Sequence, residues 1–308
     1  MTVLQEKRRL SKSDLLVSTL CLGTMTFGTP VAEPDAIRVV HEALDLGVNF
    51  IDTADIYEGY ARQLGSSGGV AEGIVGKALA GRRDRVVITS KVGNPVGHAK
   101  DEKGLGEAHI TRQLERSLTL LRTDYLDVYE LHRTDPDTDL RETIQTVGRL
   151  ITKGLVRYWG FSNFPAEDIE TMMELCAETG TPEPIVAQPL YNWLKRDVEK
   201  GYLPACRAHG ISITPYQPLQ GGLLTGKYKR AAAPPQDSRA IEQARWLPAF
   251  DEALFDAVEA FEHEARLLGR SPVAHALRWL LDQPGVASVV VGCKTIDQLG
   301  QLATAVGA

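Results

Sequence analysis

The chain has 308 residues, of which 43% are hydrophobic and 24% are charged, and these proportions are ordinary for a globular enzyme. A formal net charge of −6 argues against nucleic acid as a general partner, and no apolar run approaches the roughly 20 residues of a membrane span. The first residues lack the apolar stretch of a signal peptide, and the four cysteines form no Cys-x-x-Cys pair, so we expect a cytoplasmic protein with buried thiols.

Predicted strands and helices alternate along nearly the whole chain. Residues 8–10 and 15–18 flank a polar turn, which indicates a short hairpin ahead of the main fold. The predicted strands that follow are 19–22, 49–52, 86–91, 126–132, 156–161, 185–188, 211–215 and 287–291. The predicted helices are 33–46, 71–79, 110–121, 138–151 (capped by Asp137 or Thr138), 165–178, 198–209, 252–268, 271–281 and 295–305. A long loop is expected at 217–249.

This order of elements predicts the fold. Buried strands that alternate with helices imply a parallel sheet, and eight strand–helix units at this length favour a closed (β/α)8 barrel. The alternative is an open doubly wound sheet, but no Gly-x-Gly-x-x-Gly follows any predicted strand. We therefore predict an α/β protein with a single domain over residues 1–308, a TIM barrel with an N-terminal β-hairpin.

Three consecutive predicted strands each end in an ionisable residue. Asp52 ends one strand, Lys91 ends the next and His132 ends the third. Tyr57 lies in the loop that follows Asp52. A buried carboxylate needs a cation, and Lys91 supplies one. Any one of these residues alone is typical of a structural ion pair or a core histidine. The whole set favours catalysis, because the active site of a barrel lies at the carboxyl ends of its strands.

These four side chains suit proton delivery to a carbonyl group as it is reduced. A nearby ammonium favours phenolate, so Lys91, held by Asp52, is expected to lower the pKa of Tyr57 toward neutrality. A phenol tuned in this way is a usable general acid and base. His132 is expected to hydrogen-bond the carbonyl oxygen of the substrate and to stabilise the charge that develops there.

On these residues the chain resembles the aldo-keto reductase superfamily, from about residue 9 to residue 298. The strings Asn49–Ala54, Ile88–Lys91 and Gly160–Asn163 carry the resemblance. It implies NADPH or NADH bound without a Rossmann domain, with the tyrosine protonating the carbonyl oxygen as the nicotinamide gives up a hydride. It also implies a catalytic tetrad at the family's spacing: Asp52, Tyr57, Lys91 and His132.

The same resemblance implies a cofactor site that several loops build together. Amide and hydroxyl side chains after the fifth and sixth barrel strands would bind the nicotinamide carboxamide, and the ring of Tyr216 would stack on the nicotinamide. The residues expected to contact the cofactor are Gly23, Thr24, Met25, Asp52, Ser162, Asn163, Gln188, Tyr216, Gln217, Pro218, Leu219, Gly221, Lys227, Arg239, Gly292, Lys294 and Gln298.

The segment from Gly221 to Lys227 satisfies most of a P-loop pattern. Tyr228 stands where Ser or Thr must hold Mg²⁺, so we reject nucleotide hydrolysis and expect no metal. By the resemblance, this segment belongs to a loop that closes over the cofactor pyrophosphate. Lys294 lies beside Gly292 at a helix N-terminus, which attracts anions, and this favours a 2′-phosphate and hence NADPH over NADH.

The adenine end and the substrate pocket carry less family signal. The family commonly has Glu-Asn where this chain has Gln301 and Leu302, and a leucine cannot hydrogen-bond adenine. The substrate is expected to lie against Tyr57, His132 and Trp193.

Three functions follow from these observations. The leading one is NADPH-dependent reduction of a small-molecule aldehyde or ketone to an alcohol, with Tyr57 as general acid. One alternative is a dedicated sugar or deoxysugar reductase or dehydrogenase of the same family. Another is a non-catalytic NADPH-binding regulatory subunit, as in the channel β-subunits that share this fold. Those subunits typically lack the tetrad histidine, so His132 favours turnover.

Overall fold

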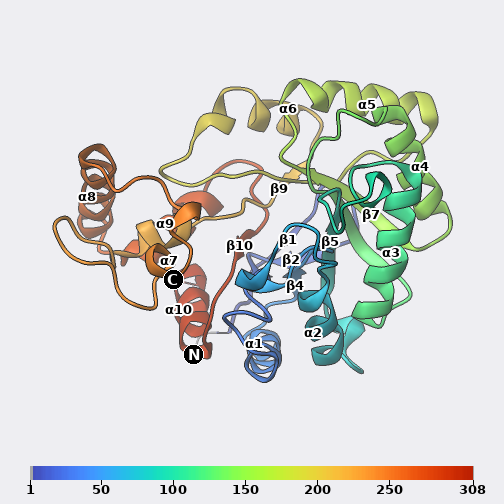
Figure 1. The fold of residues 1–308 in the computed structure, drawn as a ribbon. Coiled ribbons are helices and arrows are strands. Elements are labelled where there is room, and N and C mark those ends of the chain that lie inside the picture. The colour runs from blue at the N-terminus through green and yellow to red at the C-terminus, as the bar shows by residue number, and fades with distance from the viewer. Residues whose placement is uncertain (1–2, 308) are drawn as a thin grey trace.

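Buried apolar strands form the centre of the fold. In this computed structural model, which describes residues 3–307, eight parallel strands pair in the order β10-β3-β4-β5-β6-β7-β8-β9 (Figure 1). Their bounds are β3 (Leu20–Gly23), β4 (Phe50–Asp52), β5 (Val87–Val92), β6 (Leu126–Leu131), β7 (Val156–Ser162), β8 (Val186–Gln188), β9 (Ser212–Ile213) and β10 (Val289–Val291). Parallel bridges from Ile213 to Val286 and from Tyr216 to Val290 close the sheet. The predicted barrel is confirmed, and the ends of the expected 1–308 domain lie outside the described residues.

Amphipathic helices surround the barrel, and most of them bury an apolar face against the strands. In α4, for example, Ile144, Val147 and Leu150 are buried. Helix α8 lies farthest from the barrel, beyond α9 (Figure 1). The bounds are α1 (Glu33–Asp45), α2 (Val70–Ala78), α3 (Glu107–Leu121), α4 (Leu140–Thr152), α5 (Glu167–Thr179), α6 (Tyr202–Ala208), α7 (Arg239–Glu242), α8 (Glu252–Leu267), α9 (Pro272–Leu281) and α10 (Ile296–Gly307).

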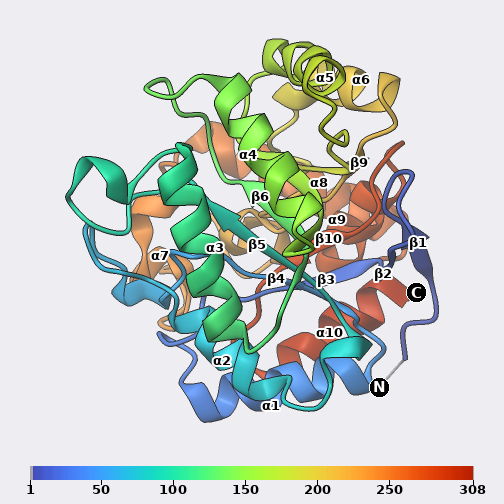
Figure 2. The same ribbon diagram turned by 90° about the vertical axis from the view of Figure 1, so that its right-hand side faces the viewer.

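The predicted hairpin closes the amino-terminal end of the barrel. Strands β1 (Lys7–Arg9) and β2 (Leu16–Ser18) pair antiparallel. Leu10, Leu15 and Val17 point from the hairpin into the barrel, where they contact the interior side chains Phe50, Val87 and Val128. Figure 2 places the hairpin at the opposite end of the molecule from α7. The loops that follow the barrel strands are therefore left to form the site at the other end.

Two predicted stretches differ from the structure because of local breaks. The helix expected at 198–209 is interrupted at Gly201, whose φ of −155° and ψ of −51° are not helical, so a 3₁₀ turn at Asp197–Lys200 precedes α6. Glycine adopts such a conformation with little steric cost. The expected loop 217–249 contains 3₁₀ turns at Gln220–Thr225 and Ala244–Trp246 as well as α7.

The N-cap of α4 is Asp139, so the prediction of Asp137 or Thr138 was wrong. The carboxylate of Asp139 accepts a hydrogen bond from the backbone N–H of Arg141 at 2.9 Å. The Thr138 hydroxyl and the Asp137 backbone N–H instead donate to the carboxylate of Asp135. An aspartate turn therefore comes first, and the helix begins one or two residues later than the pattern suggested.

All four cysteines are buried free thiols, as expected. Burial raises the pKa of each of them, so they stay protonated at neutral pH. Across residues 3–307, no helix combines the length and the apolar character that crossing a membrane requires.

Two glycines of α2 provide a matched test of how this helix packs on α3. A methyl group on Gly76 would lie 2.2 Å from the carbonyl oxygen of Leu120, whereas one on Gly73 would reach only the Leu120 side chain at 3.8 Å. We expect Gly76→Ala to lower the free energy of unfolding by about 1–3 kcal/mol, because α2 must move away from the backbone of α3. Gly73→Ala should leave stability unchanged or raise it by up to ~1 kcal/mol. Equal effects in urea unfolding would contradict this packing.

Candidate active site

A buried ion pair lies at the carboxyl ends of β4 and β5. The Nζ of Lys91 is 2.5 Å from Oδ1 of Asp52, and neither side chain is more than 3% exposed. The same ammonium donates to the carbonyl oxygen of Thr53 at 2.9 Å, and Nε2 of Gln188 donates to the Asp52 carboxylate at 2.8 Å. Charges buried this deeply are tolerated because their remaining hydrogen-bonding groups are also satisfied.

Tyr57 and His132 lie against this pair. The Tyr57 hydroxyl accepts a hydrogen bond from Lys91 Nζ at 3.4 Å, and the ammonium lies 5.0 Å from the centre of the phenol ring. The His132 ring meets the Tyr57 ring edge-on, with centroids 6.0 Å apart. The structure therefore brings together the four residues that the sequence singled out at and after the strand ends.

The expected lowering of the Tyr57 pKa was wrong. Burial raises the pKa of this phenol to about 12, because it outweighs the Lys91 ammonium, and the Asp52 carboxylate adds to the rise. For Lys91 the balance is the reverse: burial lowers its pKa, but Asp52 and Tyr57 together raise it above the usual value. At neutral pH the phenol is protonated and the lysine is charged, which is the state of a general acid beside a cation.

His132 is a neutral imidazole at physiological pH. Burial lowers its pKa well below the usual value, and the charges of Lys91 and Arg133 lower it further. Its backbone is held on both sides, since its N–H donates to Val92 and its carbonyl oxygen accepts from Nδ2 of Asn163 at 2.9 Å. Within residues 3–307 its buried Nδ1 has no hydrogen-bond partner. A fixed neutral imidazole suits hydrogen bonding to a carbonyl oxygen.

The residues expected to bind the nicotinamide carboxamide form one hydrogen-bonded chain with Tyr216, which was expected to stack on the nicotinamide ring. The Tyr216 hydroxyl donates to Oδ1 of Asn163 at 2.9 Å, and Nδ2 of Asn163 donates to the Ser162 hydroxyl at 2.9 Å. Ser162 in turn donates to the backbone carbonyl of Gln188 at 2.7 Å. Because the side chain of Gln188 binds Asp52, this chain is continuous with the tetrad.

The first-strand loop packs directly on β4. Gly23 pairs with Asp52 in register, and both the N–H and the hydroxyl of Thr24 donate to the Asp52 carbonyl oxygen, at 3.0 and 2.9 Å. A methyl group on Gly23 would lie 3.2 Å from Val290, so the glycine permits close packing. Met25, the next residue, is half-buried.

A second group of expected cofactor residues lies around the 217–249 loop and the start of α10. Pro218 is buried, Gln217 and Leu219 are half-buried, and they lead into a turn where Gly221 has a φ of 63° and Gly222 a φ of 98°. Glycine provides this left-handed backbone, and the N–H of Gly222 donates to the carbonyl oxygen of Leu219 at 2.8 Å.

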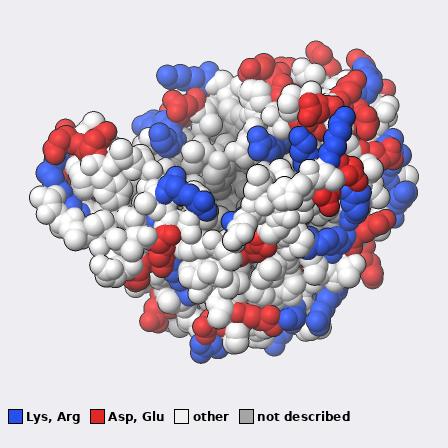
Figure 3. Space-filling view, in the orientation of Figure 1, with Lys and Arg blue, Asp and Glu red and all other residues white. Residues whose placement is uncertain are grey.

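Three cations gather beside this turn: Lys227, Arg239 and Lys294. Burial lowers the pKa of Lys227, and the charges of Lys294 and Arg239 lower it further. The Arg239 guanidinium lies 5.3 Å from the centre of the Tyr60 ring, and Lys294 lies 5.9 Å from the same ring. Figure 3 shows Lys and Arg side chains around a hollow in this face of the molecule.

Lys294 already has partners in the protein. Its ammonium forms an ion pair with Glu242 and donates to the carbonyl oxygen of Asp237 at 2.8 Å. The side-chain oxygen of Gln298 accepts from the backbone N–H of Lys294 at 2.8 Å, so Gln298 closes the first turn of α10. Lys294, expected to face a phosphate, thus faces a carboxylate of the 217–249 loop. Gly292 lies near by. A methyl group added to Gly292 would be 3.4 Å from the carbonyl oxygen of Gly23.

Two further expectations concern Trp193 and Leu302. Trp193 is half-buried and packs edge-on against Phe261 of α8, with centroids 5.4 Å apart, so part of its ring supports the loop rather than a pocket. Leu302 is 5% exposed and belongs to the core between α10 and the barrel. Its departure from the family pattern therefore fits a packing role.

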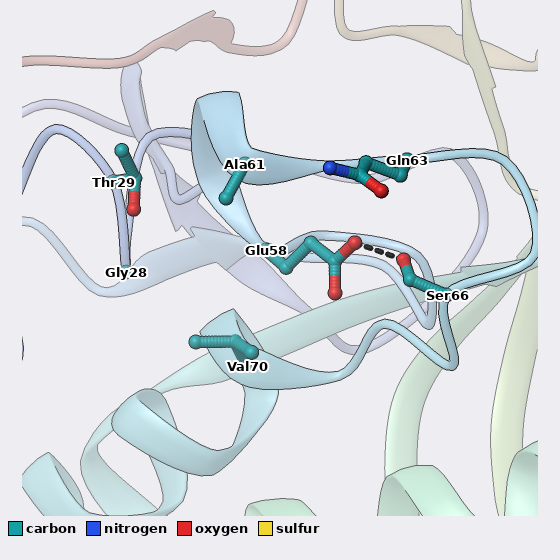
Figure 4. A pocket seen from close by; sticks show the side chains of 7 residues that line it. All are labelled: Gly28, Thr29, Glu58, Ala61, Gln63, Ser66 and Val70. Atoms are coloured by element: carbon teal, nitrogen blue, oxygen red, sulfur yellow. Dashed lines mark hydrogen bonds between the residues drawn. The ribbon is translucent and has the colours of Figure 1, made fainter.

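A cavity of about 280 Å³ lies beside the loop that follows Tyr57, between Gly28 and Val70 (Figure 4). The Ser66 hydroxyl donates to the carboxylate of Glu58 at its edge. None of the four tetrad residues lines this cavity. It is therefore separate from the ion-pair site.

Sequence reasoning missed Glu130 and Glu242. Glu130 lies two residues before His132, so the alternation of a strand places both on the same face, and that signal could have found it. Glu242 lies in a long segment without hydrophobic periodicity, and nothing in its local sequence indicates the contact with Lys294.

Comparison with known proteins identifies the class of protein to which this parallel barrel belongs. The model of the Aldo/keto reductase family matches residues 19–307. The chain therefore belongs to the aldo-keto reductase family, and it is an oxidoreductase of that family.

Individual relatives match along almost the full chain. A probable voltage-gated potassium channel subunit beta of Arabidopsis thaliana is 35% identical over 303 residues, which are 95% of this chain and 88% of the relative. An uncharacterised oxidoreductase of Bacillus subtilis is 34% identical over 297 residues, with 94% and 87% covered. The structure of an aldo-keto reductase from Bacillus halodurans in its holo form matches with a TM-score of 0.79 at 30% identity, covering 98% of this chain and 91% of that one.

The buried ion pair makes a prediction about stability. Lys91→Met leaves the Asp52 carboxylate buried without its cation, so we expect the free energy of unfolding to fall by about 3–5 kcal/mol. The double variant Asp52→Asn/Lys91→Met should recover part of this loss, because a neutral amide needs no counter-ion. Urea unfolding at pH 7 measures the double variant and both single variants, Asp52→Asn and Lys91→Met. A double variant that loses the sum of the two single losses would contradict the pairing.

Proposed function

We propose that this protein is a cytoplasmic enzyme that reduces a small aldehyde or ketone to an alcohol with NADPH, and that Tyr57 is its general acid. The geometry of the tetrad carries the proposal. A protonated phenol lies 3.4 Å from a buried ammonium and edge-on to a neutral imidazole, at the carboxyl ends of the barrel strands. This arrangement can give a proton to an oxygen and stabilise the phenolate that remains.

Each residue has a distinct role in the proposed reaction. Tyr57 donates its proton to the carbonyl oxygen, and Lys91 stabilises the resulting phenolate by its charge. Asp52 holds the ammonium in place through the 2.5 Å contact. His132 donates a hydrogen bond to the same substrate oxygen and so stabilises the negative charge that develops there. When bound, the nicotinamide supplies the hydride.

The residues at the barrel mouth fit a phosphorylated dinucleotide. Gly221 and Gly222 have left-handed backbone angles, and the cluster of three cations beside them would attract the phosphates of a dinucleotide. The carboxylate of Glu242 forms an ion pair with one of these cations, Lys294. A 2′-phosphate would replace this carboxylate as the partner of Lys294, so it is the cluster of cations that supports NADPH rather than NADH.

Two other functions are alternatives to this one. A sugar or deoxysugar reductase would use the same tetrad with a more polar substrate. A regulatory NADPH-binding subunit draws support from the similarity to a probable potassium channel β-subunit. The neutral, fixed imidazole of His132 beside Tyr57 favours turnover over regulation alone.

The general acid is tested by Tyr57→Phe, which removes the proton donor and keeps the ring. We expect kcat to fall by ~10²–10⁴-fold with little change in the affinity for NADPH. The matched control is Tyr125→Phe, which removes a phenol hydroxyl beside Arg83 at the opposite end of the barrel and should retain turnover. Both are measured by NADPH absorbance against a panel of aldoses, aldehydes and ketones. Turnover by Tyr57→Phe within a few-fold of wild type would show that another group delivers the proton.

Cofactor preference is tested at Lys294 and Glu242. Lys294→Ala should weaken NADPH binding by about tenfold, because a hydrogen bond to a charged group is lost, and should leave NADH binding unchanged. Glu242→Gln should tighten NADPH binding, because a carboxylate no longer competes for the ammonium. Glu262→Gln is the control, since Glu262 pairs with Lys229 instead. Equal affinities of the wild type for both cofactors in fluorescence titration, unchanged by Lys294→Ala, would contradict the preference.

A further inference from the structure

The barrel interior contains a carboxyl group to which the tetrad chemistry gives no role. Glu130 of β6 lies directly opposite Lys91 of β5 in the parallel register, and neither side chain has any exposed surface. Thr89 lies two residues before Lys91 and hence on the same face of β5, and its hydroxyl donates to Oε1 of Glu130 at 3.1 Å. The other oxygen, Oε2, is buried and has no hydrogen-bond partner within residues 3–307.

The neighbouring strand leaves room for this carboxyl group. Gly160 of β7 pairs with Glu130 in register. A methyl group at Gly160 would lie 2.4 Å from the carbonyl oxygen of Val186, so packing of β7 on β8 excludes a side chain there. On that side, therefore, no partner from β7 neutralises Glu130.

We propose that Glu130 is a positioning residue of the active site, a second carboxyl group opposite Lys91 whose charge acts on the Lys91–Tyr57 pair. The inference rests on the proposed function and deepens it. The strand of Lys91 lies between the strands of the two carboxyl groups: Asp52 of β4 is 2.5 Å from the ammonium, and Glu130 of β6 lies opposite Lys91 in register. Glu130 acts through Lys91 and through its charge on the phenol, and it does not touch the substrate.

The charges around Glu130 decide when it ionises. Burial raises the pKa of Glu130 to about 8, and the nearby Asp52 carboxylate adds to the rise. The Lys91 ammonium and the Thr89 hydroxyl act in the opposite direction and lower the pKa. Once ionised, Glu130 raises the pKa of Tyr57 and of Lys91. The titratable and charged groups that interact with it come from the surrounding elements: Asp52 on β4, Lys91 on β5, Cys21 on β3, Tyr202 on α6 and Tyr57 in the loop after β4.

The sign of the effect on catalysis follows from these charges. Below pH about 8 Glu130 is neutral, and above it the carboxylate makes Tyr57 a weaker acid. A weaker acid donates its proton more slowly, so kcat/KM for carbonyl reduction should fall by about three- to tenfold across a step centred near pH 8. In Glu130→Gln, which keeps the shape of the side chain, this step should be absent.

A second variant moves the step instead of removing it. Thr89→Val takes away the hydroxyl that stabilises the ionised form of Glu130, so the step should move to higher pH. In the Glu130→Gln background the same substitution should have no effect on the pH profile, because the group that it tunes is gone. Glu72→Gln is the matched control: Glu72 is also a buried carboxyl group, but it accepts from Ser90 outside the barrel interior, and the step should persist.

A measurement without cofactor or substrate completes the test. The pKa of Glu130 is about 8 in the folded chain and near 4.5 when exposed, so the folded state binds the proton more tightly. Stability is therefore lost as the pH rises from about 4.5 to about 8. We expect the Tm of Glu130→Gln to rise relative to the Tm of the wild type over this range. Above it, the difference between the two Tm values should stay constant.

The outcomes separate the two proposals. A step near pH 8 that survives in Glu130→Gln, or a Tm difference that does not depend on pH, overturns the role of Glu130. A wild-type protein that binds NADPH but turns over no carbonyl compound overturns the proposed function instead, while the Tm series still reports whether Glu130 holds a buried proton. If Glu130→Gln does not fold, the shift of the step in Thr89→Val decides the matter, and an unmoved step overturns the inference.

Discussion

The contact between Asp52 and Lys91 is the interaction on which the rest of the site depends. Two charges with almost no exposed surface are stable only together, and only if their other hydrogen-bonding groups are satisfied. Thr53 and Gln188 provide the remaining bonds, and so β4, β5 and β8 are tied to one another at the same end of the barrel. The phenol of Tyr57 lies within reach of the ammonium because of this arrangement.

Burial, which makes the ion pair necessary, also sets the protonation of its neighbours. A medium of low polarity penalises every charged form, so the phenol of Tyr57 and the imidazole of His132 are both neutral at physiological pH. Lys91 stays charged because a carboxylate touches it. The result is one ion pair beside two proton-bearing neutral groups, and this state favours giving a proton to a substrate over removing one.

At the barrel mouth the protein balances charge in a different way. Lys294 at the start of α10 pairs with Glu242 of α7, although 52 positions separate them in the sequence. The pair joins the 217–249 loop to α10, and Arg239 joins the same loop to the ring of Tyr60. These contacts are half-exposed, so each is weak and exchangeable compared with the buried pair beneath the tetrad.

The sequence by itself determined the barrel, its hairpin and the four residues at and after the strand ends. These features follow from local periodicity and from the rule that parallel strands end at one edge, so they need no knowledge of distant contacts. Only the tertiary structure decided that burial outweighs Lys91 at the Tyr57 phenol, that Glu130 lies opposite Lys91, and that Glu242 faces Lys294. Each depends on strand register or on the path of a long loop, because these bring together side chains that no local pattern relates.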